Sequence, residues 1–106
     1  MIEIVFEPKR LSLTLRGHAG AGMPGQDLIC CAASILTYTL AANVRQMQKK
    51  GWLRSGAIRL SPGDAAIACT PAKLYREQAE ARFECLCLGF RLLARDYPEF
   101  VSFREE

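Results

Sequence analysis

The sequence predicts an α+β fold in which two long helices pack on a mostly antiparallel sheet, in the order ββαββα with a short closing strand. Two observations carry this prediction. Two pairs of strand-like segments are each joined by a turn, and each pair precedes a long segment with helical spacing. The chain of 106 residues, half of them apolar, is long enough for one modest core. We therefore expect a single domain over residues 1–106.

The first pair of strands begins at the N-terminus. Residues 2–6 are rich in β-branched and aromatic side chains, and residues 7–10 contain a proline typical of a turn. Residues 11–16 then alternate leucine with polar residues, which is the period of a half-buried strand. An antiparallel hairpin follows, with Gly17 and His18 at the exit of its second strand.

A loop and a long helix come next. Residues 19–26 hold three glycines and a proline, too much backbone freedom for a regular element. Asp27 is a good N-cap, and Gly51 suits the C-terminal cap, so we expect a helix over residues 27–50. Its helically spaced apolar residues are Ala32, Ile35, Leu36, Leu40, Ala41, Val44 and Met47.

The second half repeats the strand–strand–helix order. Residues 57–60 and 65–70 are expected to form a hairpin, because residues 61–64 read Ser-Pro-Gly-Asp. Proline at the second position and glycine at the third favour type II turn geometry. This turn joins the two strands directly, so they are expected to be antiparallel.

The second helix is expected from Pro71 to about Arg95, with Thr70 as its N-cap and Pro71 at the first helical position. Tyr97-Pro98 ends it, and residues 100–103 are expected to form a short closing strand. The apolar residues expected on one stripe of this helix are Leu74, Ala81, Cys85, Leu88 and Leu92.

Charge and termini bear on the class of protein. A net charge of +3 is far from that of a dedicated nucleic-acid binder, and the adjacent basic residues at 9–10 and 49–50 are expected to be solvated surface. The N-terminus lacks the positive segment of a signal peptide, and the apolar stretches are interrupted before they reach membrane-spanning length. We expect a cytoplasmic protein, and five cysteines, an odd number, argue against a disulfide framework.

The chemistry of the chain points to His18 and Cys30. A cysteine in the first turn of a helix lies near unpaired backbone N–H groups, whose dipole favours a thiolate. Asp27 opposes this effect, so an imidazolium from His18, the only histidine, would have to stabilise the sulfur. The free N–H groups at residues 28–31 are also suited to a developing oxyanion. This set fits acyl transfer, and Ser34 lies one turn later on the same face.

Other readings of the cysteines remain open at this point. From spacing alone, a helix cysteine beside alanines is more often a small core residue than a nucleophile. Cys31 is turned about 100° from Cys30 and is expected in the core. A thiol redox protein using both would need a bridge of poor geometry. No metal or other cofactor is expected, because there is one histidine and no Cys-x-x-Cys pair. The cysteines expected to be packing residues are Cys69, Cys85 and Cys87.

The same segment resembles a known family, the ribosomal-processing cysteine proteases. These carry Gly-His-Ala, a glycine-rich loop and then Gly-x-Asp-(Ile/Leu)-(Val/Ile)-Cys-Ala-Ala-x-Ser. The matching residues are Gly17, His18, Ala19, Gly25, Asp27, Leu28, Ile29, Cys30, Ala32 and Ser34. Cys31 stands where the family usually has alanine, and the register from Asp27 and Ser34 selects Cys30 as the nucleophile.

The resemblance implies a cysteine endopeptidase with a Cys30–His18 dyad. It implies removal of a short N-terminal extension from a large-subunit ribosomal protein, the twenty-seventh of the L series, by a homodimer that needs no membrane or nucleic acid. The loop would act as a lid over the peptide. The residues expected to support the site or bind substrate are Asp27, Ser34, Gly17, Gly20, Gly22 and Gly25, with Met23 and Pro24 as an apolar surface of the lid. The alternative from another class is a non-catalytic ribosome-associated binding module.

Overall fold

The computed structural model describes residues 1–18 and 26–106, with the side chains of residues 26 and 27 left undescribed. The expectations for Gly20, Gly22 and Gly25 in a substrate lid therefore lie outside the described residues. The same holds for the expected capping and supporting roles of the Asp27 side chain.

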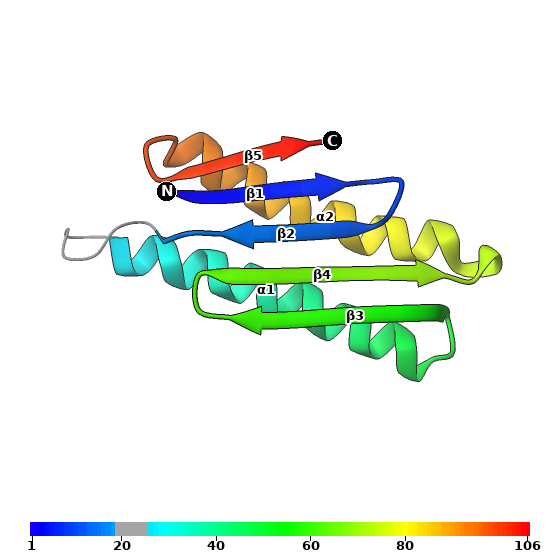
Figure 1. Cartoon of the computed structure of the whole chain (residues 1–106). Helices are drawn as coiled ribbons and strands as arrows, with labels where there is room; N and C mark the ends of the chain where they lie inside the picture. The colour runs from blue at the N-terminus through cyan, green and yellow to red at the C-terminus, as the bar shows by residue number, and fades with distance from the viewer. Residues whose placement is uncertain (19–25) are drawn as a thin grey trace.

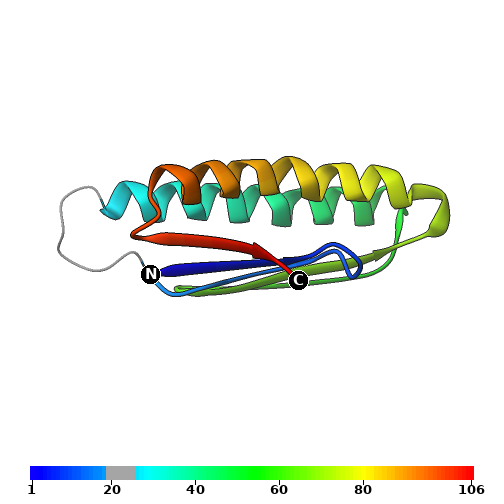
Figure 2. The ribbon, with the colours of Figure 1, turned by 90° about the horizontal axis from the view of Figure 1, so that it is seen from above.

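The described residues form a five-stranded sheet with two long helices, which confirms the predicted α+β class. The elements are β1 (Ile2–Glu7), β2 (Ser12–Arg16), α1 (Gln26–Lys49), β3 (Leu53–Ser61), β4 (Asp64–Pro71), the short helix η1 (Lys73–Tyr75), α2 (Arg76–Asp96) and β5 (Val101–Glu105). The strand order is β3-β4-β2-β1-β5, as Figure 1 shows. Every neighbouring pair is antiparallel except β1 and β5, which run parallel. Both helices cover the same side of the sheet (Figure 2).

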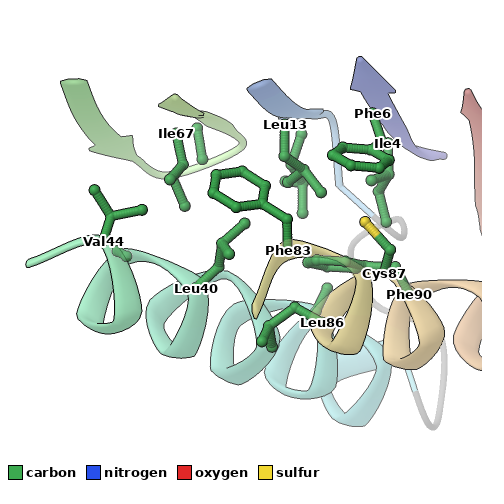
Figure 3. Close-up of a cluster of buried hydrophobic side chains, with 14 of the residues drawn as sticks. Ile4, Phe6, Leu13, Leu40, Val44, Ile67, Phe83, Leu86, Cys87 and Phe90 are labelled. Atoms are coloured by element: carbon green, nitrogen blue, oxygen red, sulfur yellow. The ribbon is translucent and has the colours of Figure 1, made fainter. Parts of the chain in front are cut away.

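The core lies between this sheet and the two helices, as Figure 3 shows. Alternate residues of the strands face it, because successive side chains of a strand point to opposite faces. Leu13 of β2 and Ile67 of β4 are register partners and are both fully buried. From the helices, Phe83 packs against Phe6 with ring centroids 6.1 Å apart. This packing fixes α1 and α2 on the sheet and so fixes the end of the molecule where α1 begins.

The start of α2 differs from the prediction. Pro71 is the last residue of β4 and pairs with Leu53 of β3, so it is not the first residue of a helix. The backbone N–H of Ala72 donates to the carbonyl oxygen of Trp52 at 2.8 Å, which extends the contact between these segments. The α-helix then begins at Arg76, after η1. Strand pairing therefore overrode the local Thr-Pro capping signal.

The predicted buried stripe of α2 was also wrong. Leu74, Leu88 and Leu92 are between 50 and 78% exposed, and Cys85 is exposed as well. The residues of α2 that face the core are Ala79, Phe83, Leu86, Cys87, Phe90 and Leu93. The physical reason is that the two phenylalanines bury more apolar area than the stripe of smaller residues. In α1, Ile35 is likewise exposed rather than buried, whereas Leu40, Ala41, Val44 and Met47 are buried as expected.

Helix α1 is more apolar than we expected for a helix of this length. Residues Leu28–Lys49 are long and apolar enough to cross a membrane by length and composition, contrary to the expectation that polar residues interrupt every such stretch. In the structure, however, this helix packs beside α2 on the sheet and contributes its buried face to the core. A core helix of a soluble protein has the same length and composition, and one third of this apolar window is buried in the structure.

Candidate active site

A cleft of about 330 Å³ opens at the end of the sheet where β2 ends and α1 begins. His18 follows β2, and Cys30 and Ser34 lie in the first turns of α1; all three line this cleft. The structure therefore brings together the thiol, the imidazole and the hydroxyl that the sequence singled out. Further residues that line the cleft are Ile2, Leu15, Gly17, Ala33, Thr37, Tyr38, Leu60, Ser61, Pro62, Gly63 and Ala65.

His18 is positioned mainly through its backbone. Its carbonyl oxygen accepts a hydrogen bond from the N-terminal ammonium of Met1 at 2.7 Å. The preceding Gly17 donates its N–H to the carbonyl oxygen of Gly63 at 2.9 Å, which ties the end of β2 to the β3–β4 turn. Gly17 itself has φ +100°, a conformation that side chains rarely adopt, and a Cβ there would collide with the backbone of Met1. The N-terminus and the turn thus fix the chain at His18.

The imidazole of His18 lies directly against the β3–β4 turn. A methyl group added at Gly63 would come within 2.6 Å of Cε1 of His18 and closer still to Nε2. Gly63 has φ +71°, which agrees with the glycine position of the predicted type II turn. The sequence predicted this turn but not its place beneath the histidine. Residues 61–63 are site residues that sequence reasoning missed, since this contact spans more than forty positions along the chain.

Cys30 is half-buried and faces the cleft from α1. The helix begins at Gln26, one residue before the predicted start. The N–H groups of the first turn of a helix have no partner within the helix, so the free donors of the described residues are those of 26–28 rather than 28–31. This corrects the expected donor set while keeping the cysteine next to the positive end of the helix dipole. A thiol, an imidazole and nearby amide donors at one cleft are suited to nucleophilic acyl transfer.

The wall of the cleft beyond Ser34 comes from the same helix. Ser34 is exposed, and Thr37 is buried with its hydroxyl donating to the carbonyl oxygen of Ala33 at 2.7 Å. Because this hydroxyl is engaged by its own helix, Thr37 presents a mainly apolar surface to the cleft. Tyr38 lines the cleft and remains 56% exposed. Thr37 and Tyr38 were not singled out from the sequence, although each lies within about one turn of Ser34.

The five cysteines are all free thiols, and they fall into two groups. Cys31 is exposed, contrary to the expectation that it lies in the core, because Cys30 takes the inward side of this turn. Cys69 and Cys87 are buried as expected. Burial raises the pKa of each of these two thiols from 9.0 to about 11, although Arg76 near Cys69 and Arg91 near Cys87 act in the opposite direction. These buried thiols are therefore poor nucleophiles.

An ion pair supports the turn beneath His18. Arg59 of β3 donates to the carboxylate of Asp64 of β4, across the Pro62-Gly63 corner. The hydrogen bond from Arg59 holds the pKa of Asp64 below its usual value, with smaller contributions from the charges of Arg59 and Arg16. Asp64 is also the register partner of Arg16 in β2. The end of β2, which leads to His18, is therefore joined to the β3–β4 turn by this strand pairing as well as by the Gly17–Gly63 hydrogen bond.

Within residues 1–18 and 26–106, no group of three or more histidine, cysteine, aspartate or glutamate side chains is close enough to hold a metal ion. The described part of the cleft offers one imidazole and one thiol as soft ligands. The thiol of Cys30 and the imidazole of His18 at this cleft supply a nucleophile and a base.

Comparison with known proteins places this cleft in context. The family described as "Cysteine protease Prp" matches residues 1–102 of the chain. A curated relative from Mycoplasma pneumoniae, named "Ribosomal processing cysteine protease Prp", is 25% identical over 96 residues, covering 89% of this chain and 86% of the relative.

Solved structures agree in fold. A crystal structure from Streptococcus mutans is 27% identical, with a TM-score of 0.67, and the match covers 98% of this chain and 90% of that one. The ribosomal processing protease Prp from S. aureus, in complex with a covalently linked product peptide, matches over 100% of both chains, with a TM-score of 0.74 and 17% identity. The S. aureus protease with a substrate peptide matches over 99% of this chain and 97% of that one, with a TM-score of 0.71 and 16% identity.

Proposed function

We propose that Cys30 is the nucleophile and His18 the base of this chain, which belongs to the cysteine protease Prp family. The proposed activity is that of a cysteine endopeptidase. One observation carries the assignment: two residues from different parts of the fold, one at the end of β2 and one in α1, line the same cleft. The family is one of cysteine proteases, and Cys30 is the half-buried cysteine that faces this cleft, whereas Cys69 and Cys87 are buried in the core.

The proposed reaction is acyl transfer in two steps. His18 accepts the proton of the Cys30 thiol, and the thiolate attacks the carbonyl carbon of the scissile peptide bond. The oxyanion that forms is stabilised by amide donors at the start of α1. The peptide C–N bond then breaks, His18 gives its proton to the leaving amine, and a thioester remains on Cys30. Water, deprotonated by His18, hydrolyses this thioester and releases the new carboxylate.

Support for a peptide substrate comes from the lining of the cleft and from the relatives. Most of the lining side chains are apolar, among them Ile2, Leu15 and Leu60, and they suit an extended peptide with apolar or aromatic residues near the cut. We propose that the substrate is the twenty-seventh ribosomal protein of the L series and that the enzyme removes a short N-terminal extension from it. The curated relative is named for ribosomal processing, which supports this choice.

The supporting roles are proposed on the same basis. Ser34 lines the cleft one turn after Cys30, and we propose that its hydroxyl hydrogen-bonds the bound peptide. For the glycine-rich segment we propose the lid role that the family resemblance implies, and for Asp27 a supporting role at the site. Gly17 contributes through its φ of +100°, which lets β2 end abruptly before His18.

We also propose a cytoplasmic homodimer. Five free thiols suit a reducing compartment. Several large apolar side chains on the two helices are exposed, namely Leu28, Ile35, Leu88 and Leu92. Burying such residues against a second copy would remove them from water. Sedimentation equilibrium of the wild type and of Leu88→Glu/Leu92→Glu tests this, with a dimer expected for the first and a monomer for the second.

The catalytic proposal is tested by incubating the full-length candidate substrate with four proteins: wild type, Cys30→Ser, His18→Ala and Cys31→Ser. Mass spectrometry locates any cut. We expect a single cut by the wild type and by Cys31→Ser, the matched neighbour control, and none by the other two. Cleavage by Cys30→Ser at the wild-type rate would overturn the assignment. Intact substrate that binds every variant equally would instead favour a non-catalytic ribosome-associated binding module.

A further inference from the structure

The end of the molecule away from the cleft concentrates positive charge. It consists of residues 7–10, 45–54 and 73–82, which we call the basic end. Nine of the fourteen basic side chains of the chain lie there, against three of its eleven acidic ones. The remainder of the chain therefore carries a net negative charge, although the protein as a whole is at +3. This asymmetry is not explained by the chemistry of the cleft.

The three segments are brought together by the fold. Figure 1 shows the β1–β2 turn, the end of α1 and the start of α2 at the same end of the molecule. Arg76 of α2 donates to the carbonyl oxygens of Pro8 and Lys9, which joins the second helix to the β1–β2 turn. Tyr75 of η1 stacks on Trp52 with ring centroids 5.1 Å apart, and this contact joins η1 to the segment that follows α1. The charges are thus gathered from three parts of the sequence.

Within the basic end, the ring of Trp52 has two cations beside it. The Nζ atom of Lys50 lies 5.4 Å and the guanidinium carbon of Arg82 lies 5.3 Å from its ring centroid. Arg82 is fixed further by donating to the side-chain oxygen of Asn43 at 2.9 Å. A bound anion near Trp52 would be attracted by both cations. The ring already has a stacking partner, so it positions cations rather than binding a base.

The surrounding cations are accessible and largely uncompensated. Lys9, Lys49, Arg54 and Lys73 are exposed. Among the ion pairs of the described residues, only two involve this end, Arg10 with Glu7 and Arg76 with Glu80. A surface with several free cations, depleted in acidic residues and spread over more than one segment, has the chemistry that binds a run of phosphates.

We propose that the basic end is a binding surface for the phosphate backbone of RNA. A phosphate backbone suits this surface, because its charges follow one another along a continuous strand and each phosphate neutralised by a lysine or arginine releases a condensed counterion. Recognition is by charge and not by base sequence, since Trp52 is occupied by Tyr75 and two cations.

The position of this surface permits RNA binding and peptide cleavage at the same time. Cys30 lies near the start of α1 and Lys50 directly follows its last residue, twenty positions later, which corresponds to about 30 Å along the helix axis. An RNA strand on the basic end therefore leaves the cleft open. If the proposed function is correct, the surface would hold the enzyme on an RNA-containing particle that presents the peptide.

The test measures fluorescence anisotropy of a labelled oligouridine of about twenty nucleotides at several salt concentrations. The variant is Lys49→Glu/Lys50→Glu, and the matched control is Arg95→Glu/Arg104→Glu, which changes the net charge equally at exposed positions elsewhere. We expect salt-sensitive binding by the wild type, at least tenfold weaker binding by the variant, and a change of less than twofold in the control. The slope of log affinity against log salt should fall by about 0.7 for each lysine that no longer neutralises a phosphate.

Three results would overturn the proposal. They are no salt-sensitive binding by the wild type, equal weakening in the control, or displacement of the RNA by polyglutamate at equal charge concentration, which would indicate an acidic protein partner. A second variant, Lys9→Glu/Lys73→Glu, decides the matter if the first does not fold. Peptide cleavage is expected to be unchanged in every variant of the basic end. Loss of cleavage in Cys30→Ser with RNA binding retained separates a failure of the catalytic proposal from a failure of this one.

Discussion

Replacing Gly63 by alanine tests whether the β3–β4 turn positions His18. Two effects are expected. The backbone at φ +71° strains an alanine by about 1–2 kcal/mol. The added methyl group would also lie within 2.6 Å of Cε1 of His18, so the imidazole or the turn must move. The first effect lowers stability, and the second displaces the proposed base.

Gly51 supplies a matched control for the first effect. Its φ is +76°, close to that of Gly63, but a Cβ built there meets nothing within 4 Å. Gly51→Ala should therefore suffer the same backbone strain without moving any side chain. In a domain of this size, each 1 kcal/mol of destabilisation lowers Tm by about 4–8 °C. We expect a similar fall in Tm for both variants.

The assay compares kcat/KM for peptide cleavage in the two variants below their melting transitions. A displacement of about 1 Å in a catalytic group can cost about a hundredfold in rate. We expect Gly63→Ala to lose at least tenfold, and Gly51→Ala to match the wild type within a factor of two. Equal activity in the two variants would refute the reasoning, whether both are active or both are impaired.

Three further predictions concern the core and the thiols. Phe83→Ala removes a fully buried ring and should lower the free energy of unfolding by about 3–5 kcal/mol, measured by urea denaturation. The pKa of the buried Cys69 and Cys87 thiols is raised from 9.0 to about 11, so the folded state disfavours their thiolates. The stabilisation that the two protonated thiols give the folded state is complete below pH 9. It should be lost as the pH rises to 11, by on the order of 2 kcal/mol of unfolding free energy per thiol. A Cys69→Ala/Cys87→Ala variant should show a flatter profile over this range, and an unchanged profile would contradict the assignment. Iodoacetamide at pH 8 should label the other three cysteines well before these two, as mapped by peptide mass spectrometry.

Local signals predicted most of the architecture. The alternation of leucine with polar residues over 11–16 predicted β2, and the Pro-Gly pair at 62–63 predicted the second hairpin, because each depends only on neighbouring residues. Prediction failed where a distant contact decided the outcome. Pro71 belongs to β4 because it pairs with Leu53, and no capping signal reports that pairing.

The helix faces show the same limit. The apolar stripe through Leu88 has the right spacing for a buried face, yet the face with Phe83 is the buried one. When a helix has apolar residues on two faces, packing against the rest of the protein decides which face is buried. For the site, the sequence identified His18 and Cys30 but could not reveal that the imidazole rests on Gly63. That contact arises only when β2 pairs with β4 and brings the end of β2 to the β3–β4 turn.

The most direct test of the central claim uses a peptide chloromethyl ketone that ends in an aromatic residue, followed by intact mass and peptide mapping. The account predicts one adduct, on Cys30, with Cys31 unmodified although it is more exposed. It also predicts much slower modification in His18→Ala, because the base is gone. Modification of Cys31 in preference to Cys30, or an unchanged rate in His18→Ala, would contradict the proposed dyad.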